Sequence, residues 1–290
     1  MAKGWMWGIV GLLCLASASA SAQVGDLIEQ ADALYDVHQG AFDFDAYGPR
    51  LKEAIATYEQ ALPLLAADSV QSRAYVLNRL AEACFEYGTA YAAGRDEQKT
   101  TFEKGKDYAL ESLRLSPDFG ATETSQGFRA ALSGAADVAA LFWYGNDLGR
   151  YIEFDPLTAI TGGMKDVEAS FARAIVLDES FLAGGPCRAM GSYLSSIPSI
   201  LGGDLDRASE YMRRAIELGP EFIENYVNYA EDYAKARQNW PLFCLEVNQA
   251  LALGRDPTTM AAWPLYNTLA LKRAQGLVLL QVNGKPVCQP

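Results

Sequence analysis

The stretch GGPCRAMGSYLSSIPSILGGDLDRASEYMRRAIELGPEFIENYVNYAEDYA (184–234) reads as three helices separated by two turns. The turn Gly202-Gly203-Asp204 precedes the central helix, along which apolar residues recur with gaps of three and four. The positions predicted to face inward are Leu205, Ala208, Tyr211, Met212, Ala215 and Leu218. Gly219-Pro220 is expected to end this helix, because proline has no N–H to donate and its ring clashes with the preceding turn.

Small and aromatic side chains alternate on the inward face of that helix. Ala208 and Ala215 leave room for a neighbouring helix, and Tyr211 fills the groove between them. This order of alanine, aromatic residue, alanine and proline is typical of the second helix in a tetratricopeptide-like hairpin. Structural turns are predicted at Gly184, Gly185, Pro186, Gly202, Gly203 and Asp204.

The same pattern recurs along the chain at irregular intervals. Equivalent positions are Ser112, Ala174, Ala215 and Ala250, which are separated by 62, 41 and 35 residues. Only the last interval is close to the regular period of about 34 residues, so we expect an irregular array with insertions. No segment alternates polar and apolar residues for long enough to indicate a sheet. The predicted fold class is therefore all-α, an array of tetratricopeptide-like helical hairpins that forms a solenoid or bundle.

Further helices are predicted in segments 24–38, 51–65, 70–93, 102–115 and 135–152, with connecting loops at 94–99 and 155–165. The last of these helices carries Leu141, Phe142, Trp143 and Tyr144 in succession. A single neighbour cannot bury four consecutive large side chains, so this helix lies in the centre of the bundle or lines a cavity. The central position is the favoured interpretation.

The first 22 residues have the pattern of a secretory signal peptide. Lys3 precedes an apolar run over residues 5–15, and the small residues Ala20-Ser21-Ala22 suit a signal peptidase. Cleavage is expected before Gln23, which leaves one all-helical domain over 23–290 without a membrane span. The alternative is a retained membrane anchor. Lipid attachment at Cys14 is not expected, since it requires a small residue before the cysteine and Leu13 stands there. We therefore expect a soluble, exported, periplasmic protein.

Charge and cysteine content limit the partners that the protein can bind and the ways its cysteines can pair. Loss of Lys3 with the leader leaves 23 basic against 36 acidic residues, a net charge of −13. This balance argues against nucleic acids and anionic membrane surfaces as partners. The remaining cysteines are Cys84, Cys187, Cys244 and Cys288, for which an oxidising compartment allows three pairings that the sequence does not distinguish. Cys84 stands among apolar residues and is expected to be a buried thiol.

Nothing in the sequence indicates catalysis. The single histidine, His38, lies near a predicted helix end, where a solvated side chain is the simpler interpretation. The chain has no phosphate-binding loop, no dinucleotide fingerprint and no cysteine pair at zinc spacing. We therefore predict no enzyme, no catalytic residue, no cofactor and no metal site.

Five segments, taken in order, resemble a known family. They are ALFWYGNDLGRYI (140–152), FLAGGPCRAMGSYLSSIP (181–198), GGDLDRASEYMRRAIELGPEF (202–222), NYAEDYA (228–234) and LALKRAQGLVLL (269–280). Together they are similar to the T-component family of tripartite ATP-independent periplasmic (TRAP) transporters. The block from Gly184-Gly185-Pro186 to Gly202-Gly203-Asp204 contributes most to this resemblance.

The resemblance implies a binding and scaffold protein with a cavity in each protomer, trimeric assembly and a periplasmic solute-binding protein as partner. Family members are often lipid-anchored, and the absence of a usable cysteine here departs from that pattern. Tyr and Trp combine a flat apolar body with one hydrogen-bonding group, so they suit such a cavity. Candidate ligand-binding residues are Trp143, Tyr144, Tyr193, Tyr226, Asn228, Tyr229 and Asp232, for a small, largely apolar organic solute. The alternatives are that these aromatic residues belong to the core, and that the protein is a general periplasmic adaptor for protein–protein interaction.

Overall fold

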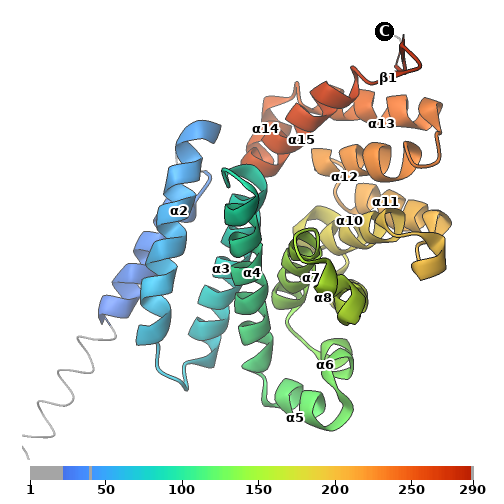
Figure 1. Ribbon diagram of the computed structural model, residues 1–290. Coiled ribbons are helices and arrows are strands. Elements are labelled where there is room, and N and C mark those ends of the chain that lie inside the picture. Colours follow the sequence, from blue (N-terminus) through green and yellow to red (C-terminus); the bar gives the residue numbers. More distant parts are fainter. Residues whose placement is uncertain (1–21, 39–40, 289–290) are drawn as a thin grey trace, which may run out of the picture.

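The computed structural model describes residues 22–38 and 41–288, and the predicted leader lies almost entirely outside this range (Figure 1). Residues 22–35 are helical, and three longer elements stand beside them in Figure 1. These are α2 (Phe44–Ala61, extended by the 3₁₀ turn η1, Leu62–Leu64), α3 (Val70–Ala90) and α4 (Arg95–Arg114).

The middle of the chain surrounds one central helix, α7 (Val138–Ile152). The elements around it in sequence are α5 (Pro117–Gln126), α6 (Phe128–Gly134), α8 (Pro156–Thr158), the π-helical turn η2 (Ala159–Gly163) and α9 (Met164–Asp178). Helix α7 contacts α3, α4, α9 and α10, and Trp143 is 1% exposed. The favoured central position of this helix is therefore confirmed.

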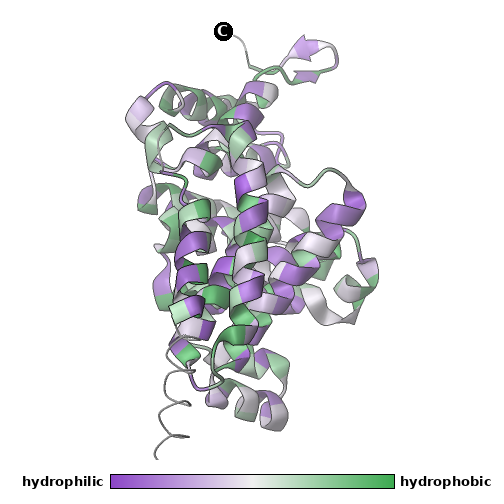
Figure 2. Cartoon of the chain, turned by 90° about the vertical axis from the view of Figure 1, so that its left-hand side faces the viewer, coloured by the Kyte–Doolittle hydropathy of each residue, from purple (hydrophilic) through white to green (hydrophobic). Residues whose placement is uncertain are grey.

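The last third of the chain stacks shorter hairpins. They comprise α10 (Phe181–Ser196), η3 (Ser199–Leu201), α11 (Leu205–Leu218), α12 (Ile223–Asn228), the π-helical turn η4 (Tyr229–Ala234), α13 (Trp240–Leu253), α14 (Pro257–Ala262) and α15 (Pro264–Leu277). A small hairpin of β1 (Gln281–Val282) and β2 (Lys285–Pro286) follows and projects from the body (Figure 2).

The array curves back on itself, so that α15 reaches the N-terminal helices. Leu265 is 1% exposed and shares a core cluster with Tyr35, Tyr47 and Leu51. The Lys272 ammonium lies 3.4 Å from the centre of the Phe44 ring, a cation–π contact. These contacts join the two ends of the array.

The predicted repeat positions mark helix contacts. Ala174, Ala215 and Ala250 are fully buried, and Ser112 is 4% exposed. A β-carbon placed on Gly184 would lie only 2.8 Å from the Cα of Ala215, so α10 and α11 meet at backbone distance there. The all-α fold is confirmed, and the small residues at these positions permit its close helix packing.

The turn before α11 also forms as its residues suggest. Gly202 adopts a φ of 106°, a left-handed value that suits glycine, and a β-carbon on Gly203 would collide with the Ile197 carbonyl oxygen. The Asp204 side chain accepts hydrogen bonds from the Asp206 and Arg207 amides. Asp204 is therefore the N-cap of α11.

Several predicted boundaries are wrong. Helix α2 begins at Phe44, although the predicted helix begins at residue 51, because Asp43 caps an earlier turn and Pro49 is accommodated inside the helix. Helix α4 begins at Arg95 instead of after a loop over 94–99. The segment 155–165 is largely helical, since Pro156 starts α8.

One disulfide joins Cys244 of α13 to Cys288 in the C-terminal tail. Cys84 and Cys187 remain as buried thiols, which confirms the expectation for Cys84. Within the described part of the chain, no helix has the length and apolar character needed to cross a bilayer.

Candidate binding cleft

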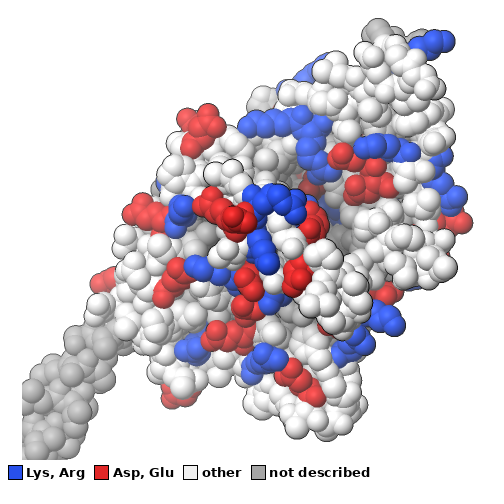
Figure 3. Space-filling model, viewed as in Figure 1, with Lys and Arg blue, Asp and Glu red and all other residues white. Residues whose placement is uncertain are grey.

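A cleft of about 540 Å³ lies between the central helices and the returning C-terminal helices. We call it the main cleft. Figure 3 shows a hollow in this region of the surface, with basic and acidic side chains around it. Its apolar wall includes Phe85, Phe142, Trp143, Met164, Val167 and Phe171, and Asn146, Arg150 and Glu153 of the same region also line the cleft. Its polar wall consists of Arg188, Ser192, Glu224, Asn228, Asp232 and Arg273.

The apolar wall is built mainly by α7 and α9. Trp143 packs edge-on against Phe142, with ring centres 4.8 Å apart, and also contacts Phe85 from α3 at 5.5 Å. Gly145 allows α9 to approach, because a β-carbon there would lie 2.5 Å from the Phe171 ring. This wall is therefore closely packed and aromatic, suited to the apolar part of a ligand.

Arg188 is the central charge of the polar wall. It is 5% exposed, its guanidinium lies 4.5 Å from the Phe222 ring centre, and its Nε lies 3.4 Å from a Glu224 carboxylate oxygen. Burial lowers the pKa of Arg188. Arg273 joins the network through ion pairs with Glu224 at 3.5 Å and Glu231 at 2.8 Å. The two arginines are thus held by carboxylates at one end of the cleft.

A second polar group lies beside this network. Ser192 donates to an Asp232 carboxylate oxygen at 2.6 Å and accepts from the Asn228 amide nitrogen at 3.2 Å. The Asn228 carbonyl oxygen Oδ1 is buried and has no hydrogen-bond partner among the described residues. Burial raises the pKa of Asp232. An unpaired buried acceptor in a cleft wall is a natural contact for a ligand that carries an N–H or O–H group.

Asn225 fixes the position of the polar wall. Its Nδ2 atom lies within 3.0 Å of the carbonyl oxygens of Ala183, Ala215 and Gly219, and its Oδ1 accepts from Arg188 at 2.8 Å. The side chain is 1% exposed. It therefore ties the start of α10, the end of α11 and the central arginine together.

The start of α10 has an unusual backbone. Leu182, Ala183 and Gly184 all adopt left-handed φ values, of 48°, 53° and 81°. Only glycine takes this conformation at little cost, so the first two positions are strained. Asn225 holds the Ala183 carbonyl, and the Leu182 side chain lines the main cleft. Gly185 and Pro186 follow as the first regular residues of α10.

The candidate ligand-binding residues separate into two groups. Trp143, Tyr193, Asn228 and Asp232 all line the main cleft. Tyr144, Tyr226 and Tyr229 do not line it and instead make packing contacts elsewhere. Tyr144 packs against Phe128, the Tyr226 hydroxyl donates to the Pro220 carbonyl, and the Tyr229 hydroxyl lies 2.9 Å from that of Ser209.

The sequence interpretation missed Arg188, Glu224, Asn225 and Arg273. Arg188 stands two residues after Pro186, and an arginine within an otherwise small and apolar segment was an available signal. Glu224, Asn225 and Arg273 resemble the polar residues that ordinarily lie on the exposed faces of helices. Their part in the cleft depends on how α12 and α15 pack.

Comparison with known proteins now gives the family. The family model of the TRAP transporter T-component matches residues 59–281, a segment that contains the whole lining of the main cleft. No curated protein matches the chain at a significant level. The match spans well over half of the chain and confirms the resemblance of its five ordered segments. This protein therefore belongs to the T-component family of TRAP transporters.

Proposed function

We propose that this protein is the periplasmic accessory subunit of a TRAP-type solute uptake system. In this proposal residues 1–22 are removed on export, and the mature protein binds the solute-binding protein of the transporter. The disulfide between Cys244 and Cys288 supports an oxidising compartment. The family match supports the transport role, and trimeric assembly follows from the family resemblance.

The main cleft is the single observation that carries the ligand-binding part of the proposal. An aromatic wall faces a wall with one arginine network, formed by the buried Arg188 and the partly exposed Arg273, and an unpaired Asn228 oxygen. This combination fits a small organic solute with a largely apolar body and one polar end. The main cleft is partly open to solvent, so its aromatic wall, and not enclosure, favours a small-molecule ligand over a general adaptor.

Filling the cleft should abolish ligand binding without unfolding the protein. Ala189 on α10 lines the cleft and is partly buried, so Ala189→Phe places a ring in the space that a ligand would occupy. The probe is anilinonaphthalene sulfonate, which has apolar rings and one anionic end. We expect saturable fluorescence enhancement with the parent protein and at least about a tenfold weaker affinity with the variant.

The matched control is Ala252→Phe, which adds the same ring at an exposed position of α13. It should bind the probe as the parent does, and thermal melts of both variants report on folding. Equal probe affinity for a folded Ala189→Phe and the parent would remove the main cleft as the binding site.

A further inference from the structure

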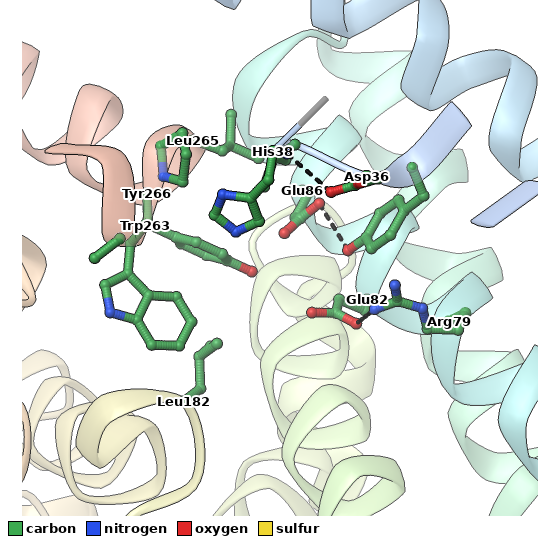
Figure 4. A pocket seen from close by; sticks show the side chains of 13 residues that line it. Asp36, His38, Arg79, Glu82, Glu86, Leu182, Trp263, Leu265 and Tyr266 are labelled. Atoms are coloured by element: carbon green, nitrogen blue, oxygen red, sulfur yellow. Dashed lines mark hydrogen bonds and ion pairs between the residues drawn. The ribbon is translucent and has the colours of Figure 1, made fainter. Parts of the chain in front are cut away.

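A second cavity of about 320 Å³ lies where α15 meets the first helix and α3 (Figure 4). We call it the side cavity. Its lining includes Tyr35, Glu82, Glu86, Leu182, Trp263 and Tyr266. Leu182 and Tyr266 line the main cleft as well, so the two spaces share a wall.

Glu86 is a buried carboxyl group of the side cavity that forms no ion pair with a described cation. It is 5% exposed, and its Oε2 atom accepts a hydrogen bond from the Tyr35 hydroxyl at 2.9 Å. The neighbouring Glu82 is ion-paired with Arg79 at 2.9 Å, and that guanidinium stacks 4.2 Å from the Tyr35 ring centre. Arg79, the arginine among the described lining residues, therefore pairs with Glu82 through its Nη1 atom. No Lys, Arg or His among the described residues forms an ion pair with Glu86.

A second group of the cavity is also without a partner. The Tyr266 hydroxyl oxygen is buried, lies near the Glu86 carboxyl and makes no hydrogen bond of acceptable geometry within the described chain. Figure 4 shows the Tyr266 ring and the carboxyls of Glu82 and Glu86 pointing toward a common space, with the Trp263 indole beside it. Two buried polar groups thus face a cavity that has an aromatic side.

We propose that the side cavity binds a small organic primary ammonium ion. Its N–H groups donate to Glu86 and to the Tyr266 hydroxyl oxygen, while its carbon chain lies against Trp263 and Leu182. Aromatic rings beside a carboxylate are a recurring environment for ammonium groups, since the ring faces attract cations. This site is independent of the proposed transport function.

A divalent metal ion fits this cavity less well. No group of three or more Asp, Glu, His or Cys side chains in the described part of the chain converges as metal ligands. Calcium requires six to eight oxygen ligands, and Glu82 is already engaged by Arg79. The aromatic side of the cavity offers nothing to a hydrated metal ion but suits an alkyl chain.

Binding of the ammonium ion in the side cavity should depend on pH. Burial and the nearby Glu82 carboxylate raise the pKa of Glu86 to about 8, so the empty cavity holds this group protonated at neutral pH. The other charged or titratable groups around it are Tyr35, Asp36, His38, Tyr47, Arg79 and Tyr266. An entering ammonium ion favours the carboxylate form, so binding releases a proton. Affinity therefore rises with pH up to about the pKa of Glu86.

The test is isothermal titration calorimetry of the full exported protein with n-butylammonium. Titrations in two buffers with different ionisation enthalpies measure the proton release. We expect saturable binding of n-butylammonium, no comparable binding of the neutral n-butanol, and an affinity that is higher at pH 8 than at pH 6. Glu86→Gln should weaken binding at least about tenfold and remove the proton release.

The matched control is Glu246→Gln. Glu246 on α13 is also a buried carboxyl, 8% exposed, whose burial raises its pKa to about 7, but it lines neither cavity. This variant should bind n-butylammonium as the parent does. Tyr266→Phe removes only an unpartnered hydroxyl and should weaken binding about three- to tenfold in a folded protein.

Three results would overturn the proposal. They are equal binding of n-butanol and n-butylammonium, unchanged affinity in both Glu86→Gln and Tyr266→Phe, and equal weakening by the Glu246→Gln control. Calcium that binds and excludes n-butylammonium would assign the cavity to a metal instead.

Discussion

Asn225→Ala should lower the free energy of unfolding by about 3 to 5 kcal/mol, although it removes only a few atoms. The amide lies within hydrogen-bond distance of three backbone carbonyl oxygens and accepts from the buried Arg188. Alanine removes the acceptor of the buried Arg188 Nη1 atom and a donor to the carbonyl oxygens, although those of Ala215 and Gly219 each keep a backbone N–H donor. An orphaned buried polar group costs about 1 to 3 kcal/mol, and more when it is charged.

Urea denaturation measures this loss, and Asn248→Ala is the matched control. Asn248 is exposed on α13, so its replacement should change stability by no more than about 0.5 kcal/mol. A loss below about 1 kcal/mol for Asn225→Ala would show that Asn225 does not hold the polar wall as described.

Removal of the disulfide should lower the free energy of unfolding by a similarly large amount. The bond between Cys244 and Cys288 closes a loop with a sequence separation of 44 residues. Loop-closure entropy then predicts that Cys244→Ser with Cys288→Ser lowers the free energy of unfolding by about 4 kcal/mol. The bond also holds Val287 and the C-terminal tail in the cluster around Phe243.

Reduction provides an internal control for this prediction. Dithiothreitol should destabilise the parent protein by about the same amount and leave the double serine variant unaffected. Destabilisation of the serine variant by the reductant would mean that another cysteine pair forms in solution.

The parts of the fold that follow from local periodicity were predictable. The spacing of Ala208, Tyr211 and Ala215 indicates which helix face is buried, and the structure places both alanines at 0% exposure. The start of α2 was missed because the predicted helix, 51–65, begins only after Pro49, whereas this proline is tolerated inside the helix. The small β-hairpin was also missed, although Asn283-Gly284 is a strong turn signal and both residues have positive φ.

The candidate site was predictable only where local geometry suffices. Trp143 and Tyr144 are adjacent on a helix and therefore point about 100° apart. The equally adjacent Phe142 and Trp143 both line the main cleft, so helical spacing alone does not identify the residues that face it. The ion pairs of Arg188 and Arg273 with Glu224 depend instead on the packing of α15 beside α12. No local sequence pattern predicts this long-range contact. The same is true of the pairing of Cys244 with Cys288.

The accessory role is tested most directly by sedimentation velocity of the mature protein mixed with a TRAP solute-binding protein from the same organism. The account predicts a new species that sediments faster than either protein alone, whose amount saturates with the concentration of the solute-binding protein. Two unchanged boundaries at every mixing ratio would contradict it.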